Sequence, residues 1–319
     1  MTAADIARAV GVSRATVGFV LNDTPGQTIS EATRTRVLEA ARRLGYRPHL
    51  AAQALASGRS RIILLVLPDW PMEYSMRRHV DEASIALDEA SYSLVTMTPH
   101  AGGKARPLWE TLQPDVVMGM MPFTPERFEE IRAAGVPVVI PAPEDGAERV
   151  ELSFSKGPRL QIEHLLARGH RRVAFAASPD PRLGELVSSR FAVAEATARA
   201  RGMLSLERID IEAEGVMAQV DQWHRAGVTG VVAYNDDIAA LVVGAAIRLG
   251  LAVPSDLAVV GHDDSPLAQM FLPALTSVHV DDAGLGRYFA QLALAAAKGQ
   301  PAPSTAPEQQ VSLVERESS

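Results

Sequence analysis

The segment AADIARAVGVSRATVGFVLN, residues 3–22, decides the fold at the start of this chain. In its first half, Ile6 and Val10 recur at helical spacing, and Gly11 supplies a position where a helix can end in the left-handed conformation. Its second half opens on Ser13, whose hydroxyl can accept a hydrogen bond from an unpaired backbone N–H at a helix start. The spacing therefore predicts two short helices joined by a tight turn.

The second predicted helix has two different faces. Three apolar residues form its inner face: Val17, Val20 and Leu21. Small and mixed residues form its outer face: Arg14, Ala15, Gly18 and Phe19. A helix of this kind, set on a short turn from its partner, has the geometry that enters the major groove of DNA. The stretch therefore indicates double-stranded DNA as a partner.

The charge of the chain is divided unevenly. The whole chain of 319 residues has a formal net charge of −7, but residues 1–61 hold nine arginines and four acidic residues, a net +5, which leaves −12 for the rest. A small basic module on an acidic body is typical of a module that binds nucleic acid. Helical surfaces are often rich in arginine for other reasons, so charge alone leaves the choice open.

Residues 30–45 predict a third helix, with Ser30 at its N-cap and Gly45 at its end. The segment LAAQALASGRS that follows, residues 50–60, has the length of about two helical turns, which is too short to be stable alone in water. A marginal helix between two domains is suited to act as a switch. An ordinary linker fits the same residues, and the periodicity does not choose between the two.

After Arg61 the pattern becomes that of an α/β protein. Apolar runs lie at residues 62–67, 93–97, 115–120, 136–140, 172–177, 230–234 and 257–261, and helices are expected between them, for example at about 157–168 and 184–201. Apolar strands separated by helices predict parallel sheets covered on both sides. Two consecutive sets imply two lobes. Because ligands of such sheets bind beyond the carboxyl ends of the strands, the cleft between the lobes is the expected small-molecule site.

Composition and motifs argue against several other classes of protein. The chain has no cysteine, no apolar run long enough to cross a bilayer and no charged-then-apolar leader, so we expect a cytoplasmic protein without disulfides. His164 and His170 are six residues apart, whereas one helical face requires three or four, so we expect no metal. The adjacent Asp263 and Asp264 would point to opposite faces of a strand. With no phosphate-binding loop or GxSxG elbow, we expect no cofactor and no catalysis.

Several stretches of sequence, taken in order, carry a resemblance to a known family. They are ADIARAVGVSRATVGFVLN (4–22), TRTRVLEAARRLGYRPH (33–49), AAQALASGRS (51–60), EHLLARGHRRVAF (163–175), NDDIA (235–239), LGLAVPSDLAVVGHDDSP (249–266), LPALTSVHV (272–280) and LVERES (313–318). With these stretches the chain resembles the lactose-repressor (LacI/GalR) family of bacterial transcription regulators over essentially its full length.

The resemblance implies three parts. An all-α helix-turn-helix headpiece takes residues 1–47, a hinge helix and linker take 48–60, and an effector-binding and dimerisation domain takes 61–319. That domain is shaped like periplasmic binding proteins, with two doubly wound parallel-sheet lobes. We expect the N-lobe at about residues 61–151 and 281–300, and the C-lobe at about 152–280 and 301–319.

The resemblance also implies how such a protein works. It forms a homodimer on a nearly palindromic operator, and we expect this chain to act as a repressor. A small-molecule effector, by analogy a sugar or sugar derivative, binds in the cleft and shifts one lobe against the other. That shift changes whether the hinge helices form. Tetramers in some relatives use a leucine heptad tail, and the end of this chain has none, so we expect dimers.

Three groups of DNA-binding residues follow from the resemblance. Base edges are implied as the partners of Arg14, Ala15 and Phe19. The DNA backbone is implied as the partner of Thr2, Ser13, Thr16, Asn22, Ser30, Thr33 and Tyr46. The hinge group is His49, Ala52 and Leu55, in which Leu55 is the apolar wedge of the central minor-groove step. Arg14 can pair with guanine in the major groove, and a phosphate contact is the alternative. For Ser13 and Ser30 the alternative to a DNA contact is helix capping.

Three positions in or beside these groups depart from the pattern of the family. Phe19 stands where an arginine is common; it cannot donate a hydrogen bond, and it either presses on a thymine methyl or packs against the hinge. Gly18 replaces the usual serine, which removes one expected phosphate contact. His49 replaces the asparagine that usually follows the proline, with no predicted consequence.

Effector-binding residues are implied at the cleft. Arg190 matches an arginine that binds ligand hydroxyls or carboxylates, and Asp263 matches an aspartate that accepts hydrogen bonds from sugar hydroxyls or base nitrogens. The remaining candidates are Asp69, Trp70, Phe123, Ser153 and Asn235, of which the two aromatic residues suit stacking on a sugar face. Ser153 stands where many members carry aspartate, and Val193 where they carry glycine, so we expect unusual ligand chemistry.

Two other functions fit parts of the pattern. A small-molecule-binding protein of the same fold without a DNA role is the main alternative, and the attached headpiece and missing leader argue against it. A sugar-active enzyme using the cleft is the other. The hypothesis that we favour is an effector-responsive, sequence-specific DNA-binding regulator.

Overall fold

The structure is a computed structural model of residues 1–319 that describes all of them except 22–25, 47–58, 101, 144–147, 204 and 304–310. For residues 148–155 and 205 it describes the backbone alone. Three of the predicted hinge residues, His49, Ala52 and Leu55, and the predicted backbone contact Asn22 therefore lie outside the described residues.

The first part of the chain folds into three short helices around a small apolar core. They are α1 (Ala3–Val10), α2 (Arg14–Leu21) and α3 (Glu31–Arg43). Ile6, Val17 and Val37 have no exposed surface, because each helix turns its apolar stripe toward the other two. Gly11 has a φ of 74° and ends α1 in the left-handed region. The two helices and the tight turn expected from the sequence are confirmed.

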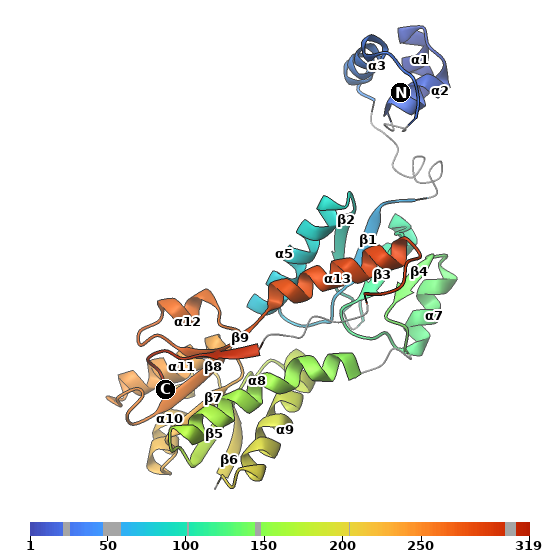
Figure 1. The fold of residues 1–319 in the computed structure, drawn as a ribbon. Helices are drawn as coiled ribbons and strands as arrows, with labels where there is room; N and C mark the ends of the chain where they lie inside the picture. The colour runs from blue at the N-terminus through green and yellow to red at the C-terminus, as the bar shows by residue number, and fades with distance from the viewer. Residues whose placement is uncertain (22–25, 47–58, 101, 144–147, 204, 304–310) are drawn as a thin grey trace.

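The first lobe is built on a four-stranded parallel sheet with the order β2-β1-β3-β4. Its strands are β1 (Ile62–Val66), β2 (Ser93–Met97), β3 (Val116–Gly119) and β4 (Val138–Ile140). Its helices are α5 (Tyr74–Glu89), α6 (Leu108–Leu112), α7 (Pro125–Ala133) and, from far along the chain, α13 (Asp282–Ala297). Helices α13 and α5 lie side by side (Figure 1). Gly286 allows this approach, because a Cβ there would lie 2.5 Å from the carbonyl oxygen of His79.

The second lobe is built on a six-stranded sheet with the order β10-β9-β8-β7-β5-β6, in which only the β10–β9 pair is antiparallel. Its strands are β5 (Arg172–Ala177), β6 (Ser205–Asp210), β7 (Gly230–Ala233), β8 (Ala258–His262), β9 (Thr276–Val280) and β10 (Val311–Val314). Its helices are α8 (Glu148–Ala167), α9 (Gly184–Ala200), α10 (Val216–Arg225), α11 (Asp236–Arg248) and α12 (Pro266–Met270), with a 3-10 turn at Pro181–Leu183. Strands β7 and β8 are buried along their whole length, as strands covered by helices on both sides must be.

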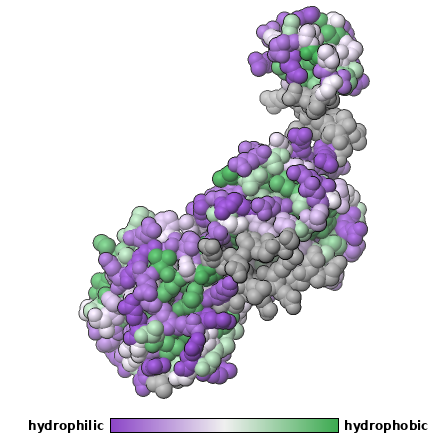
Figure 2. Space-filling model, in the orientation of Figure 1, coloured by the Kyte–Doolittle hydropathy of each residue, from purple (hydrophilic) through white to green (hydrophobic). Residues whose placement is uncertain are grey.

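The chain passes between the two sheets from β4 to α8, from β9 to α13 and from α13 to β10. The expected class, a helical headpiece followed by an α/β body with parallel sheets, is confirmed. Figure 2 shows apolar residues, in green, interspersed with hydrophilic ones on the visible face of the second lobe. Within the described residues, no helix is both long enough and apolar enough to span a membrane.

Candidate functional site

The outer face of α2 is exposed, as a DNA-reading face must be. Arg14 and Ala15 are exposed and Phe19 is partly exposed, whereas Val17 and Val20 on the opposite face are buried in the headpiece core. The side of α2 that carries Arg14 is therefore available to a partner. This exposure is compatible with the prediction that these residues contact base edges.

Gly18 on the same helix is not required by packing. A Cβ built at Gly18 would meet no atom within 4 Å, so a serine or alanine would fit without moving a neighbour. The departure from the serine usual in the family therefore changes what this face offers to DNA and not how the headpiece folds.

The hydroxyl residues predicted to touch the DNA backbone also cap the helices. Ser13 Oγ accepts a hydrogen bond from the backbone N–H of Thr16 at 3.0 Å and lies 2.9 Å from Thr16 Oγ1. Ser30 Oγ accepts from the N–H of Thr33 at 3.3 Å and donates to Thr33 Oγ1 at 2.9 Å. Ser13 and Ser30 are exposed and Thr16 and Thr33 are partly exposed at helix N-termini, where backbone N–H groups favour phosphate, so capping and a backbone contact are compatible.

The remaining two backbone candidates of the headpiece are also engaged. The N–H and hydroxyl of Thr2 donate to Asp5 Oδ2 at 2.9 and 3.0 Å. These two hydrogen bonds hold the pKa of Asp5 below its usual value. The ring of Tyr46 packs against the headpiece core.

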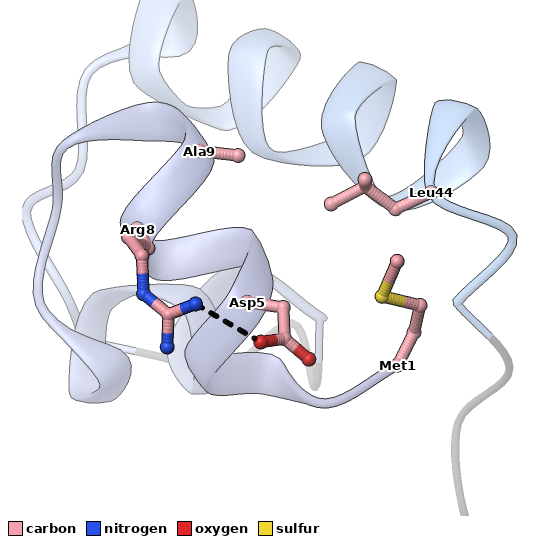
Figure 3. Close-up of a pocket in the computed structure, with 5 residues that line it drawn as sticks. All are labelled: Met1, Asp5, Arg8, Ala9 and Leu44. Atoms are coloured by element: carbon pink, nitrogen blue, oxygen red, sulfur yellow. Dashed lines mark hydrogen bonds and ion pairs between the residues drawn. The ribbon is translucent and has the colours of Figure 1, made fainter.

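A shallow pocket lies on the headpiece beside α1 (Figure 3). It is lined by Met1, Asp5, Arg8, Ala9 and Leu44. Met1 and Leu44 point toward each other across it, and Arg8 pairs with Asp5 at 3.5 Å. None of the residues predicted to contact base edges lines this pocket.

The second lobe brings three predicted effector residues together at the carboxyl ends of β7 and β8. Asn235 follows β7 and caps α11, since its Oδ1 accepts from the N–H of Ile238 at 2.9 Å. Asp263 follows β8, and Arg190 reaches this edge from α9. Parallel strands end at one edge of the sheet, so residues far apart in sequence converge there.

Arg190 is held by several contacts in this cluster. Its Nη1 donates to the carbonyl oxygen of Tyr234 at 2.6 Å, and its Nη2 lies 3.8 Å from Asp263 Oδ1. The guanidinium also lies over the ring of Tyr234, 4.7 Å from the ring centre. Its Nε is buried and has no hydrogen-bond partner among the described residues.

Asp263 is a buried and conformationally unusual residue. Its φ is 93°, a region that residues other than glycine rarely adopt and that tends to occur at functional sites. Burial favours a raised pKa for Asp263, but the hydrogen bond from His262 Nδ1 at 2.7 Å and the charge of Arg190 outweigh it, so its pKa lies below the usual value. Burial and Arg190 together lower the pKa of His262, which suits a neutral imidazole donating to a carboxylate.

Sequence reasoning missed one residue at this site, Glu73 in the first lobe. Its Oε2 accepts a hydrogen bond from the Tyr234 hydroxyl at 3.2 Å, and its Oε1 accepts from Asn235 Nδ2 at 3.1 Å. Burial, and then the negative charge of Asp263, raise the pKa of Glu73 to about 7. Its position after the first strand of the α/β body, four residues beyond Asp69, was the signal that could have found it.

The four remaining effector candidates differ in where they lie. Trp70 packs against the cores of both lobes, so it lies between them as expected. Asp69 is partly exposed and Oδ1 lies 2.9 Å from His100 Nδ1. Phe123 is only 8% exposed and packs in the first-lobe core against Gly119, which places its ring inside that core and not at an open cleft mouth. The backbone of Ser153 belongs to α8, and its side chain lies outside the described atoms.

Other acidic residues near the site bond within the second lobe. Asp236 accepts from the Ser277 hydroxyl at 2.6 Å and the Ser265 N–H at 2.7 Å, and burial raises its pKa to about 7. Asp264 pairs with Arg316 at 2.5 Å, and at φ 45° it follows β8. The expectation that Asp263 and Asp264 lie within a strand is wrong, because β8 ends at His262 and the chain turns there.

Comparisons with known proteins place this architecture. Residues 2–49 match the family described as bacterial regulatory proteins, lacI family, and residues 162–319 match the periplasmic binding protein-like domain. The HTH-type transcriptional regulator MalR of Streptomyces coelicolor is 31% identical over 326 residues, which cover 94% of this chain and 91% of the relative. This chain belongs to the LacI family.

Solved structures of LacI-family members share the fold of the whole chain. The lac repressor dimer bound to operator and an anti-inducer has a TM-score of 0.75 at 24% identity, and the match covers 100% of this chain and 98% of that one. The complex of the transcriptional regulator CelR with cellobiose has a TM-score of 0.62 at 25% identity and covers both chains completely. As a LacI-family member, the protein is a DNA-binding transcriptional regulator, and these relatives are regulators, not enzymes.

Proposed function

We propose that the protein is a repressor that binds a nearly palindromic operator as a homodimer and is controlled by a small molecule between its two lobes. The observation that carries this proposal is the exposed outer face of α2 on a packed three-helix headpiece. We further propose the domain division 1–47, 48–60 and 61–319, with a cytoplasmic location, since the target is DNA. The bases are contacted by Arg14, Ala15 and Phe19.

The small molecule is proposed to be a sugar or sugar derivative. It lies among Arg190, Asn235 and Asp263 of the second lobe and Trp70 of the first. This proposal is supported by the convergence of the three second-lobe residues at the carboxyl ends of β7 and β8 and by the cellobiose complex of the relative CelR. The buried Nε of Arg190, which has no partner among the described residues, is a donor available to a ligand oxygen.

Selection from random duplexes tests the DNA-binding proposal directly. The full chain is incubated with a random double-stranded pool, and the recovered sequences are confirmed by gel shift. We expect an enriched inverted repeat whose half-sites lie about one helical turn apart, as two symmetric recognition helices require. Recovery of no common sequence, or of a single half-site without symmetry, would contradict the proposed mode of binding.

Light scattering on the purified chain tests the oligomeric state. A dimer is expected, in keeping with the lac repressor dimer that shares the fold. A stable monomer at micromolar concentration, or a stable tetramer, would contradict this part of the proposal. The second half-site of the operator would then have to be bound in some way other than by the α2 helix of a dimer partner.

A further inference from the structure

Glu73 is a half-buried carboxylate whose hydrogen-bond partners among the described residues are neutral. Its two oxygens accept hydrogen bonds from the hydroxyl of Tyr234 and the amide of Asn235, and neither donor carries a charge. Both donors belong to the second lobe and Glu73 belongs to the first. The two hydrogen bonds therefore connect the lobes at the place where we propose the effector to bind. A carboxylate taken out of water without a cation is costly, and a cation placed beside it offsets that cost.

The charges that act on Glu73 are unbalanced. Asp263 and Asp237 are negative neighbours, and Arg190 is the positive one. With Glu73 ionised, these four groups carry three negative charges and one positive charge. Arg190 is already directed at the Tyr234 carbonyl and at Asp263, so within the described parts of the chain the carboxylate of Glu73 has no ion pair of its own.

Two histidines near this cluster are engaged with other residues. His262 donates to Asp263 and is held neutral by burial and by Arg190. His79 Nε2 lies 2.9 Å from Asp282 Oδ1, and the Ser75 hydroxyl donates to Asp282 Oδ2 at 2.8 Å. Neither histidine therefore supplies the positive charge that Glu73 lacks.

A second and independent observation shows what else the ligand must offer. Arg190 is only 7% exposed, and its Nε has no hydrogen-bond partner among the described residues. A buried donor without a partner favours a ligand that brings an acceptor oxygen. Tyr234 connects the two positions, because its ring lies under the Arg190 guanidinium and its hydroxyl binds Glu73. Arg190 and Glu73 therefore belong to one cluster around Tyr234.

We propose that Glu73 contacts the effector and determines its specificity, selecting a hydroxylated small molecule that carries a protonated amine. The amine binds the Glu73 carboxylate in a charge-assisted hydrogen bond, and a hydroxyl oxygen accepts from Arg190 Nε. An amino sugar or amino polyol has both groups. A neutral sugar leaves the excess negative charge in place, and a sugar acid or phosphate adds to it. The inference rests on the proposed effector site between the lobes.

The test compares matched ligands on the full chain by isothermal titration calorimetry. The probes are glucosamine, galactosamine and mannosamine, each beside its neutral parent sugar and its N-acetyl form, which lacks the charge. We expect at least one amine to bind about ten-fold or more tightly than both of its neutral counterparts. If no amine exceeds its counterparts, including the case in which nothing in the panel binds, the proposal is overturned.

Two variants assign the preference to Glu73. Glu73→Gln keeps the size of the side chain and removes the charge, so the preference for the amine should fall to within about three-fold of parity. Glu82→Gln is the matched control, because Glu82 lies on the same helix but pairs with Arg78 and Arg287. The control should keep the full preference. A preference for the amine that survives in Glu73→Gln overturns the assignment. If glutamine prevents folding, Glu73→Asp, which keeps the charge, serves as a second variant.

Failure of this inference is distinguishable from failure of the proposed function. Glu73 lies far from α2 in sequence and belongs to the effector site, so ligand-free Glu73→Gln is also assayed for duplex binding. If the wild type binds its duplex normally but shows no amine preference, the amine proposal alone is overturned. If the wild type shows no sequence-specific duplex binding, the proposed function is overturned, whether or not any sugar binds.

Discussion

Replacing Glu73 by glutamine is expected to change how the stability of the protein depends on pH. The pKa of Glu73 is about 7 in the folded protein, against an ordinary value of 4.5. At pH values between these two, Glu73 therefore keeps a proton in the folded state that it has lost in the unfolded state. For that reason the wild type should lose stability as the pH rises from about 4.5 through 7, and this contribution should be gone above about pH 8. Glutamine cannot ionise and removes the effect.

The size of this effect follows from the two pKa values. A group that titrates at 7 when folded and 4.5 when unfolded contributes about 2.5 kcal/mol more stability near pH 5 than near pH 8. The side chain is partly exposed, so solvent screening reduces this figure to roughly 1–2.5 kcal/mol. At roughly 2 °C per kcal/mol for a domain of this size, the melting temperature of Glu73→Gln relative to wild type should rise by roughly 2–5 °C between these pH values.

Thermal melting of both proteins across this pH range is the assay. Asp236 also has a pKa raised to about 7, but it is present in both proteins and cancels in the difference. Glu82→Gln, which loses the ion pairs with Arg78 and Arg287 instead, should melt parallel to the wild type at every pH. If the difference between Glu73→Gln and wild type is flat between about pH 5 and 8, or has the opposite sign, the burial argument for Glu73 is wrong.

The remaining predictions concern the headpiece and the hinge. Arg14→Ala should weaken operator binding about 5- to 150-fold in an anisotropy titration if Arg14 contacts guanine, with relaxed specificity at one base pair, whereas Arg8→Ala on α1 should change little. Equal losses on operator and random duplex would instead assign Arg14 to a phosphate. Val17→Ala should destabilise the headpiece by roughly 2 kcal/mol, since Val17 is fully buried, and this is measurable as earlier loss of headpiece helicity on heating; an unchanged midpoint would contradict that packing. Leu55→Ala should weaken operator binding and leave effector affinity intact, and unchanged operator affinity would remove the minor-groove wedge from the account.

Much of the fold could be predicted because its elements are locally encoded. The stripes at Ile6 and Val10 and at Val17 and Val20 carry enough periodicity to predict helices α1 and α2. The central strands were also predictable, since β7 and β8 are buried on both faces and therefore consist of continuous apolar residues. Capping by Ser13 was predictable because it depends on residues three apart in sequence.

The elements missed by the sequence lie at edges or depend on distant contacts. Strand β6, at Ser205–Asp210, forms one edge of its sheet, and its residues SLERID carry charges where they meet solvent. Helix α8 begins at Glu148, nine residues before the expected start at about 157. Gly157 and Pro158 resemble a helix start, but Gly157 is small because a Cβ there would collide with the His262 ring.

The candidate site was predictable only in its second-lobe half. Arg190, Asn235 and Asp263 follow strands or lie on a helix that the pattern already placed, and the resemblance supplied their roles. Glu73 could not be predicted in the same way, because its importance comes from hydrogen bonds to Tyr234 and Asn235, more than 160 residues away. Such a contact exists only once the two lobes are brought together, and no local pattern reports it.

The central claim is that the two headpieces of a dimer bind duplex DNA together. Its most direct test is the salt dependence of the affinity of the protein for the selected inverted repeat. Fluorescence anisotropy between about 50 and 200 mM salt should show a loss of about 10³–10⁵ in affinity if the two headpieces together neutralise 6–10 phosphates. An affinity that stays constant over this range, or that is equal for the inverted repeat and a single half-site, would contradict the claim.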